Sequence, residues 1–546
     1  MPRGMRCLAW LMLAAISVSA VGLRRLMEAP ISELPVHGTV VANKTPVAGA
    51  VVRFAGGPEA VASDDKGAFT LSCPAKRDGA RVVASKSGFF IAGADAGQGR
   101  LSIDLRPHPV DDNPDYAWID PRPDPSDAGR CANCHREIFD EWSASSHAAS
   151  ATNRRFLNVY DGTDWKGNQH VGWDLVHDLP DGAGVCHSCH LPSQPPPIEV
   201  ATDLRLVEGV YRQGIHCDFC HKITDVSVDN VGLDHGRFAI AFVRPRGEQQ
   251  IFFGPLDDVD RGDDVYLRVY KESRYCASCH EGTLFGTHVY GTYSEWLESP
   301  QAKQGLQCQD CHMAPTGRMT NFAPNQGGIE RDPATLASHH FPGSDAGFLR
   351  EHLSLSLEAR ETAMGLEVEA LVRVHGVGHR VPTGSPSRQL VLHVEAVADD
   401  GAPLALIEGA ELPALAGSGS QLFRGDPGSS EFLASALSRT IASGSLGGRP
   451  GKLFAKVLEG DDGEQGVPIW RSNLVAYDTR LNPDEVNRTR FVFRPSKGAS
   501  RVSARLLYRR FSKQVADEKG WPDNELLIDS LTCETGQSGF PSMPAR

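Results

Sequence analysis

The sequence lacks the short motifs by which many enzymes bind or activate their substrates. It has no phosphate-binding glycine loop, no Gly-x-Ser-x-Gly turn and no His-Glu-x-x-His pair for a catalytic zinc. It also lacks a surplus of basic residues: 68 Asp and Glu outnumber 55 Lys and Arg, and the formal net charge is −13. Because binding to DNA or RNA needs a basic surface, we expect no nucleic acid partner.

Long hydrophobic runs are missing after the N-terminus. Residues 7–23, CLAWLMLAAISVSAVGL, carry no charge and follow a positively charged start. This pattern predicts a secretory signal that is cleaved after Ala20. The alternative is an uncleaved membrane tether, since seventeen residues reach about the short limit for spanning a bilayer. Either way we expect an exported protein that is periplasmic, anchored facing the periplasm, or at the cell surface.

Cysteine is present in a regular pattern. Of thirteen cysteines, ten belong to five copies of Cys-x-x-Cys-His. They are motif 1 (Cys131, Cys134, His135), motif 2 (Cys186, Cys189, His190), motif 3 (Cys217, Cys220, His221), motif 4 (Cys276, Cys279, His280) and motif 5 (Cys308, Cys311, His312).

Cys-x-x-Cys-His is the attachment signature of c-type haem. The two thiols add to the haem vinyl groups, and the adjacent histidine binds the iron from one side as the proximal ligand. Zinc would need a fourth ligand in each site. A redox dithiol would need only one motif, and disulfides give no reason for the histidine. We therefore expect five covalently bound c-type haems.

Part of the sequence is duplicated. EWSASSHA at 141–148 and EWLESPQA at 295–302 align, so Gln301 stands where His147 stands in the first copy. Residues 136–149 lack Pro and Gly and predict a helix that carries His147 about 18 Å from His135. His147 should therefore bind the iron of a neighbouring haem. The second copy offers His288 from a different place.

The motifs, together with EWSASSHA, YGTYSEWLESP, GLQCQDCHM, SHHFPG and GHRVPTG, resemble the cytochrome c-552/c-554 family of multihaem c-type cytochromes. The similarity covers about residues 115–387. It implies electron transfer between redox protein partners, with distal ligands at His147, His288, His339 and His379. SHHFPG also offers His340, and the sequence does not choose between the two.

The fifth distal ligand stays open. The candidates are His177 and His216, with His170, His187 and His235 as further choices. A haem without a distal histidine would be able to bind a small molecule, so counting histidines does not separate an electron carrier from an enzyme.

The flanks predict a multidomain fold: a mainly α or irregular multihaem cytochrome domain between two β-sandwiches. Residues 34–106 show short alternating strands, and PVAGA and DKGAF resemble the carboxypeptidase regulatory-like domain. The expected boundaries are 1–23 for the signal or anchor, 34–106, 107–355 for the haem domain, 356–535 for the second sandwich and 536–546 for the tail. Cys73 and Cys533 lie in different β domains, which favours free thiols over a disulfide.

Electron transfer through mostly bis-histidine haems is the function that these features favour, and the sequence shows no set of catalytic residues. The first alternative is a multihaem oxidoreductase with one open haem that acts on a small nitrogen or sulfur compound. The second is a haem-bearing surface module of a larger electron-export assembly.

Overall fold

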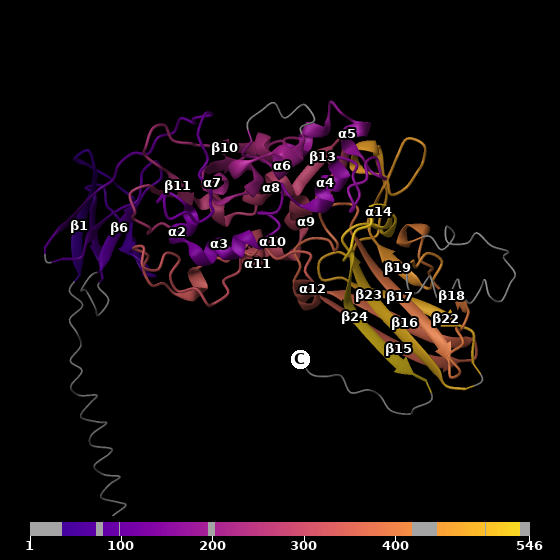
Figure 1. Cartoon of the computed structure of the whole chain (residues 1–546). Coiled ribbons are helices and arrows are strands. Elements are labelled where there is room, and N and C mark those ends of the chain that lie inside the picture. Colours follow the sequence, from indigo (N-terminus) through magenta and orange to yellow (C-terminus); the bar gives the residue numbers. More distant parts are fainter. Residues whose placement is uncertain are drawn as a thin grey trace, which may run out of the picture. The chain divides into compact units, whose positions relative to one another are not determined.

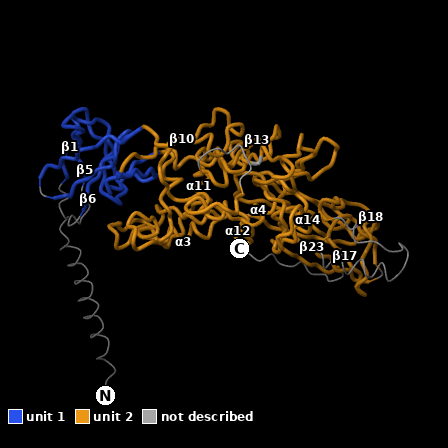
Figure 2. Tube along the Cα trace, turned by 45° about the horizontal axis from the view of Figure 1, so that its top comes forward, with its two compact units in different colours: residues 1–110, 248–267 blue, residues 111–247, 268–546 orange. Residues whose placement is uncertain are grey.

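The computed structural model describes residues 35–72, 80–97, 99–194, 203–417, 445–496 and 498–535. The predicted signal or anchor, Cys7, Cys73 and the tail lie outside these residues. The chain divides into two compact units, residues 1–110 with 248–267 and residues 111–247 with 268–546 (Figure 2). Among the described residues, no helix has the length and apolar character that crossing a bilayer requires.

The first unit contains two four-stranded sheets. One has the order β2-β1-β5 with β8 paired to β1, and the other has the order β4-β3-β6-β7. Alternating side chains of β1 and β3 are buried, and they meet in one apolar core that includes Val40, Val52 and Ile103. The strands are β1 (Val36–Ala42), β2 (Thr45–Pro46), β3 (Val51–Phe54), β4 (Ala60–Ala62), β5 (Ala68–Leu71), β6 (Arg81–Ser85), β7 (Ala92–Asp95) and β8 (Leu101–Asp104).

Residues 248–267 belong to this first unit, although the sequence assigned them to the haem domain. They contain the parallel pair β11 (Phe252–Gly254) and β12 (Asp264–Tyr266). Arg53 binds Asp257 at 3.0 Å, and the Ile91 amide donates to the Asp264 carbonyl at 2.9 Å. These contacts come from an insertion far along the chain, which local sequence patterns do not reveal.

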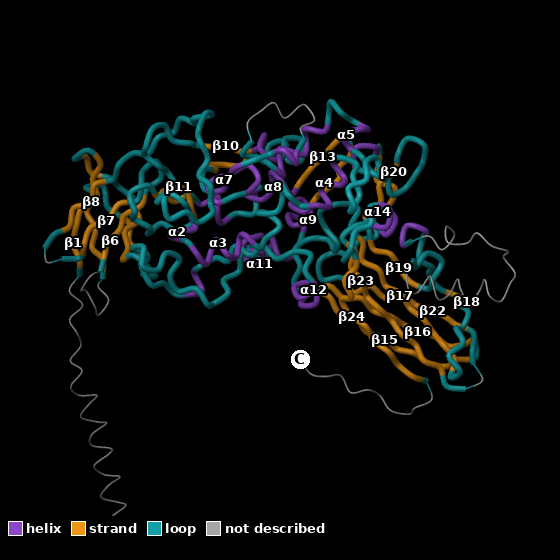
Figure 3. Tube along the Cα trace, in the orientation of Figure 1, coloured by secondary structure: helices purple, strands orange, loops and turns teal. Residues whose placement is uncertain are grey.

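The region of the five motifs is built from short helices joined by loops (Figures 1 and 3). Its α-helices are α2 (Cys131–Cys134), α3 (Arg136–Ser143), α4 (Arg154–Tyr160), α5 (Leu175–Asp178), α6 (His187–His190), α7 (Cys217–Cys220), α8 (Arg274–His280), α9 (Thr292–Glu298), α10 (Pro300–Lys303), α11 (Cys308–His312) and α12 (Ala346–His352). Its 3-10 turns are η1 (Ala183–Cys186), η2 (Leu204–Leu206), η3 (Gly209–Gln213), η4 (Gly236–Ala239), η5 (Arg268–Lys271) and η6 (Pro333–Thr335), and its strands are β9 (Ile223–Val226), β10 (Ile240–Phe242), β13 (Glu281–Leu284) and β14 (Thr287–Gly291).

The helix expected over residues 136–149 is shorter in the structure. α3 ends at Ser143, and turns follow up to His147. The Ser145 hydroxyl accepts a hydrogen bond from the Ala148 amide at 3.4 Å, so a serine side chain takes over from the helical backbone pattern. The prediction of a continuous helix was wrong at its C-terminal end, whereas the His147 ring still lies near motif 4, with its centre 6.3 Å from that of His280.

The C-terminal part of the second unit contains two four-stranded sheets with the orders β15-β16-β22-β18 and β19-β17-β23-β24. Their buried faces share a core that includes Val368, Leu392, Phe491 and Leu506. The strands are β15 (Leu353–Thr362), β16 (Gly365–Val374), β17 (Gln389–Ala398), β18 (Leu406–Glu408), β19 (Gly451–Phe454), β20 (Lys456–Glu459), β21 (Leu474–Asp478), β22 (Val486–Phe493), β23 (Ser500–Arg509) and β24 (Glu525–Glu534). η7 (Ala414–Ala416), η9 (Ile469–Arg471) and α14 (Lys513–Glu518) lie in the connections.

The sheets and the haem region of the second unit are joined by buried polar contacts. The Lys519 ammonium donates to the carbonyls of Asn158, Thr163 and Trp173 at 2.8, 3.1 and 2.7 Å. The Trp470 indole N–H donates to Asp178 at 2.8 Å. The loop between β16 and β17, which contains His379, contacts the haem region through a hydrogen bond of its own, from the Arg380 amide to Glu295 at 3.1 Å.

Candidate haem-binding site

Each attachment motif is built around one short helix, which brings its two cysteines and its histidine toward one side. His135 and His221 directly follow their helices, and Cys186 directly precedes its own. The helices are α2, α6, α7, α8 and α11, in the order of the motifs. In a helix, residues three and four positions apart share a face. The first cysteine, the second cysteine and the histidine of Cys-x-x-Cys-His have this spacing, which suits a planar ring attached at two points and ligated from one side.

Three proximal histidines are oriented by backbone carbonyls. Nδ1 of His135 lies 2.9 Å from the Phe322 carbonyl, Nδ1 of His190 lies 3.0 Å from that of Ser150, and Nδ1 of His312 lies 2.7 Å from that of Pro342. A carbonyl can only accept, so Nδ1 carries the proton in each ring. Nε2 then keeps its lone pair for a metal, the arrangement common for histidine ligands.

Two pairs of histidine rings have the separation that one iron requires. Metal–imidazole bonds are about 2 Å long, so an iron between two rings keeps their centres about 6 Å apart. The ring centres of His147 and His280 are 6.3 Å apart, and those of His312 and His379 are 6.2 Å apart. The residues thus fit a haem between the rings of each pair. The first pair joins the stretch after motif 1 to motif 4, as crossed ligation predicts.

His379 is prepared for metal binding by its own loop. Its Nδ1 lies 3.0 Å from the Arg380 carbonyl, which leaves Nε2 as the lone-pair nitrogen. Burial lowers the pKa of His379 to about 4, and it does the same to His147. Both rings are therefore neutral at pH 7, which is the form that binds iron.

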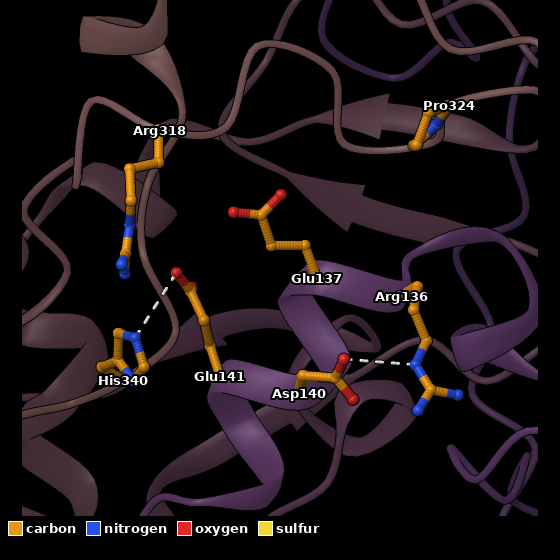
Figure 4. A pocket seen from close by; sticks show the side chains of 7 residues that line it. All are labelled: Arg136, Glu137, Asp140, Glu141, Arg318, Pro324 and His340. Carbon is orange, nitrogen blue, oxygen red and sulfur yellow. Dashed lines mark hydrogen bonds and ion pairs between the residues drawn. The ribbon is translucent and has the colours of Figure 1, made fainter.

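The structure distinguishes His339 from His340. His339 is half-buried, and its pKa falls to about 4 through desolvation of the ring and the neighbouring charge of His221. The side chain of His340 is 45% exposed and lies 3.6 Å from Glu141. The charges of His221, His135 and His147 all act on His339, that of His221 most strongly, so we expect His339 to be the ligand opposite motif 3. Figure 4 shows His340 instead among Arg136, Glu137 and the other residues of an open pocket of about 410 Å³.

The other predicted distal ligands are less well placed. Nε2 of His288 lies 2.7 Å from Glu281, and the His288 side chain is 49% exposed. The His177 side chain is 69% exposed and lies 3.6 Å from Asp178. His216 is buried, and its Nδ1 accepts from the Phe219 amide at 3.2 Å, so a neutral ring carries its proton on Nε2. The ligand roles of all three stay predictions.

Contacts between the motifs join all five into one group. The thiols of three cysteine pairs lie close enough for each thiol to shift the pKa of its neighbour. The pairs are Cys131 with Cys217, Cys276 with Cys308, and Cys189 with Cys279. The Tyr275 hydroxyl, next to the first cysteine of motif 4, donates to the Cys220 carbonyl at 2.9 Å. Motif 1 therefore lies beside motif 3, motif 3 beside motif 4, and motif 4 beside motifs 2 and 5. Sequence spacing did not reveal these neighbours.

Glu141 and Glu295 are residues that the sequence analysis did not assign to the site. Both accept backbone hydrogen bonds from the loops that carry His339 and His379. The sequence feature that could have pointed to these two glutamates is their position at the start of the duplicated stretches EWSASSHA and EWLESPQA.

Comparisons with known proteins give a family match and a solved structure of similar fold. Residues 130–222 match the family described as cytochrome c554 and c-prime. The crystal structure of a penta-heme cytochrome c552 from Thermochromatium tepidum is similar in fold, with a TM-score of 0.50, 19% sequence identity, and coverage of 74% of this chain and 97% of that chain. No curated protein matches the chain. The family match around motifs 1 to 3, the fold and the paired histidines together support a multihaem c-type cytochrome.

Proposed function

We propose that the chain is an exported pentahaem c-type cytochrome that transfers electrons along covalently bound, mostly bis-histidine haems. The contacts that join the five motifs into one connected group carry this proposal. Electron transfer between cofactors slows steeply with distance, so attachment points that lie close together favour transfer along the group. The thiols of Cys131 and Cys217 mark one such approach, and those of Cys276 and Cys308 mark another.

The protein's own residues account for much of the required chemistry. A bound c-type haem supplies an iron that takes up and releases one electron. The cysteines fix each ring, and the backbone carbonyls of Phe322, Ser150 and Pro342 fix the orientation of three proximal imidazoles. His147 and His379 provide a second imidazole at ligand spacing. Two imidazoles leave an iron no free position for substrate, which favours an electron carrier.

A multihaem oxidoreductase is the second candidate, and motif 2 is where it would act. The ring of Phe156 stacks on the His190 imidazole, with ring centres 3.8 Å apart and an interplanar angle of 7°. The ring contacts of the described residues place no second imidazole at ligand spacing from His190. A haem on motif 2 that keeps an open position would bind a small nitrogen or sulfur compound.

The remaining proposals concern the flanking sheets, the redox partners and the N-terminal tether. We propose that the two sheets of each flank form a β-sandwich, the first of the carboxypeptidase regulatory-like type, and that redox protein partners dock on the protein outside the cytoplasm. A role as a surface module of an electron-export assembly would use the same docking. The proposed N-terminal tether would keep the protein at the membrane.

The haem count and the spin states test the function. The mature protein, produced with a c-type maturation system, should show five haem additions by mass spectrometry. Magnetic circular dichroism of the oxidised protein should show mostly low-spin, bis-nitrogen haems. Fewer than five additions, or mostly high-spin haems, would contradict the proposal. One high-spin haem that binds nitrite or sulfite would favour the oxidoreductase.

A further inference from the structure

A Glu-Trp pair occurs once in α3 and once in α9, and the two tryptophans make equivalent contacts. The Trp142 indole N–H donates to the Ile215 carbonyl at 2.8 Å. The Trp296 indole N–H donates to the Leu306 carbonyl at 3.0 Å. Each carbonyl lies two residues before the first cysteine of a motif, motif 3 in one case and motif 5 in the other. Each tryptophan therefore fixes the chain where it enters an attachment helix.

The two glutamates also make equivalent contacts. Oε2 of Glu141 accepts from the His339 amide at 2.7 Å and from the hydroxyl of the preceding serine at 3.1 Å. Oε2 of Glu295 accepts from the Arg380 amide at 3.1 Å and from the Thr383 hydroxyl at 3.0 Å. The first amide belongs to the imidazole that lies beside motif 3. The second directly follows the imidazole that faces motif 5.

The surroundings of the two pairs repeat as well. Ser145 accepts from the Ala148 amide at 3.4 Å, and the aligned Ser299 accepts from the Ala302 amide at 3.1 Å. The first cysteine of motif 1 lies close to the first cysteine of motif 3, and the first cysteines of motifs 4 and 5 lie close to each other in the same way. The duplicated unit is thus a motif, a Glu-Trp pair and a second motif, and motif 2 is an insertion in the first copy.

Both carboxylates are buried, which costs free energy unless their oxygens are satisfied. Glu141 is 5% exposed, and the Glu295 side chain is 10% exposed. Glu295 has a strong charge partner in Arg480 at 2.7 Å. Glu141 has the weaker partner His340 at 3.6 Å, toward which it points in Figure 4. Both glutamates therefore accept hydrogen bonds from a ligand loop, but their charge partners differ between the two duplicated stretches.

We propose that Glu141 and Glu295 are ligand-positioning residues. Each glutamate holds the loop of a distal histidine against a haem, and the tryptophan that follows it holds the attachment motif of the same haem. Glu141 and Trp142 act on motif 3 and His339, and Glu295 and Trp296 act on motif 5 and His379. One dipeptide thus sets the distance between the two sides of a haem site. This inference rests on the proposed binding of haem at motifs 3 and 5.

The full-length, haem-loaded protein allows a direct test by magnetic circular dichroism. Glu295→Ala should give the same high-spin signal as His379→Ala. Glu141→Ala should give the same high-spin signal as His339→Ala. In each case the high-spin fraction should rise by up to one haem in five. Added imidazole should restore the low-spin spectrum, because it replaces a displaced side chain. Glu295→Gln and Glu141→Gln should stay low-spin, since an amide oxygen can accept from the same N–H group.

Glu298→Ala in α9 and Glu137→Ala in α3 are matched controls, because both glutamates are exposed on the same helices. They should leave the spectrum unchanged. If the alanine variants do not accumulate, Glu295→Asp and Glu141→Asp can replace them. Aspartate is one methylene shorter, so its carboxylate lies farther from the ligand loop. These variants should bind added imidazole faster at one haem. Low-spin alanine variants, or aspartate variants that bind imidazole no faster than the wild type, would overturn the positioning role. A wild-type mass with fewer than five haems would instead contradict the proposed function.

Discussion

At the scale of single residues, the direction of each imidazole decides what the site can bind. His147 and His379 are half-buried, neutral and at ligand spacing from a proximal histidine. His340 is half exposed and directed at Glu141. The sequence identified these residue types, but it placed His339 and His340 on an equal footing because their difference is one of burial.

His147→Ala should convert one haem from low-spin to high-spin, and that haem should be the one on motif 4. The reason is that the His147 ring faces His280 at 6.3 Å. Magnetic circular dichroism measures the spin change, and peptide mapping should show motif 1 still carrying its haem. His37→Ala is a control, since His37 lies in the first unit and bonds to Thr70. A change at the haem of motif 1 instead would refute crossed ligation.

Asp264 should make the stability of the first unit depend on pH. Burial raises the pKa of Asp264 from 3.8 to about 6. The folded state then holds the proton more tightly than the unfolded state, so this contribution to stability is complete below about pH 4 and is lost as pH rises through 6. Its size is up to about 3 kcal/mol.

Asp264→Asn should remove that dependence and raise the unfolding temperature of the first unit at pH 7, while Asn can still accept from the Arg261 amide. Calorimetry at pH 4 and pH 7 measures the change. Equal effects of the substitution at both pH values would show that the carboxyl group does not titrate in this range.

At the scale of elements, the local sequence pattern predicted whether a segment is helix or strand better than it predicted where that element ends. The alternating sequences of the flanks predicted strands, and β16 and β23 show this alternation of buried side chains. The helix over 136–149 ended early, because Ser145 bonds to the backbone that the helix would need. The assignment of residues 248–267 to the first unit depends on ion pairs such as Arg53 with Asp257, which have no local signature.

His379→Ala should loosen the contact between the C-terminal sheets and the haem region. The loop of His379 is held by Glu295, which also binds Arg480. Loss of the iron–imidazole bond removes one of these links, so the high-spin fraction should rise by one haem in five and protease cleavage near Leu355 should become faster. His375→Ala, in the same loop, is the control. An unchanged spectrum with unchanged protease resistance would make His379 an ordinary turn residue.

At the scale of the whole molecule, the five motifs were evident from the sequence, while their neighbours were not. Cys131 lies beside Cys217 across 86 positions, from 131 to 217, and no spacing rule predicts that contact. His147 meets His280 in the same way. Covalent attachment of a haem depends only on the five consecutive residues of its Cys-x-x-Cys-His motif. Distal ligation depends on which loops the folded chain brings together.

Cys186→Ser with Cys189→Ser should remove one haem and leave four. Each motif holds its haem through its own two sulfurs, so the loss should stay local. The mass of the intact mature protein measures it, with Cys533→Ser as the control because Cys533 is a free thiol in β24. Loss of two or more haems would show that the haems are not attached independently.

A crystal structure of the haem-loaded protein will show which imidazoles bind each iron. It should contain five covalently bound haems and a single iron about 2 Å from both His147 and His280. A second iron should lie at the same distance from His312 and His379. An iron at motif 4 or motif 5 that is ligated on its distal side by any other residue, or by none, would contradict the proposed ligation.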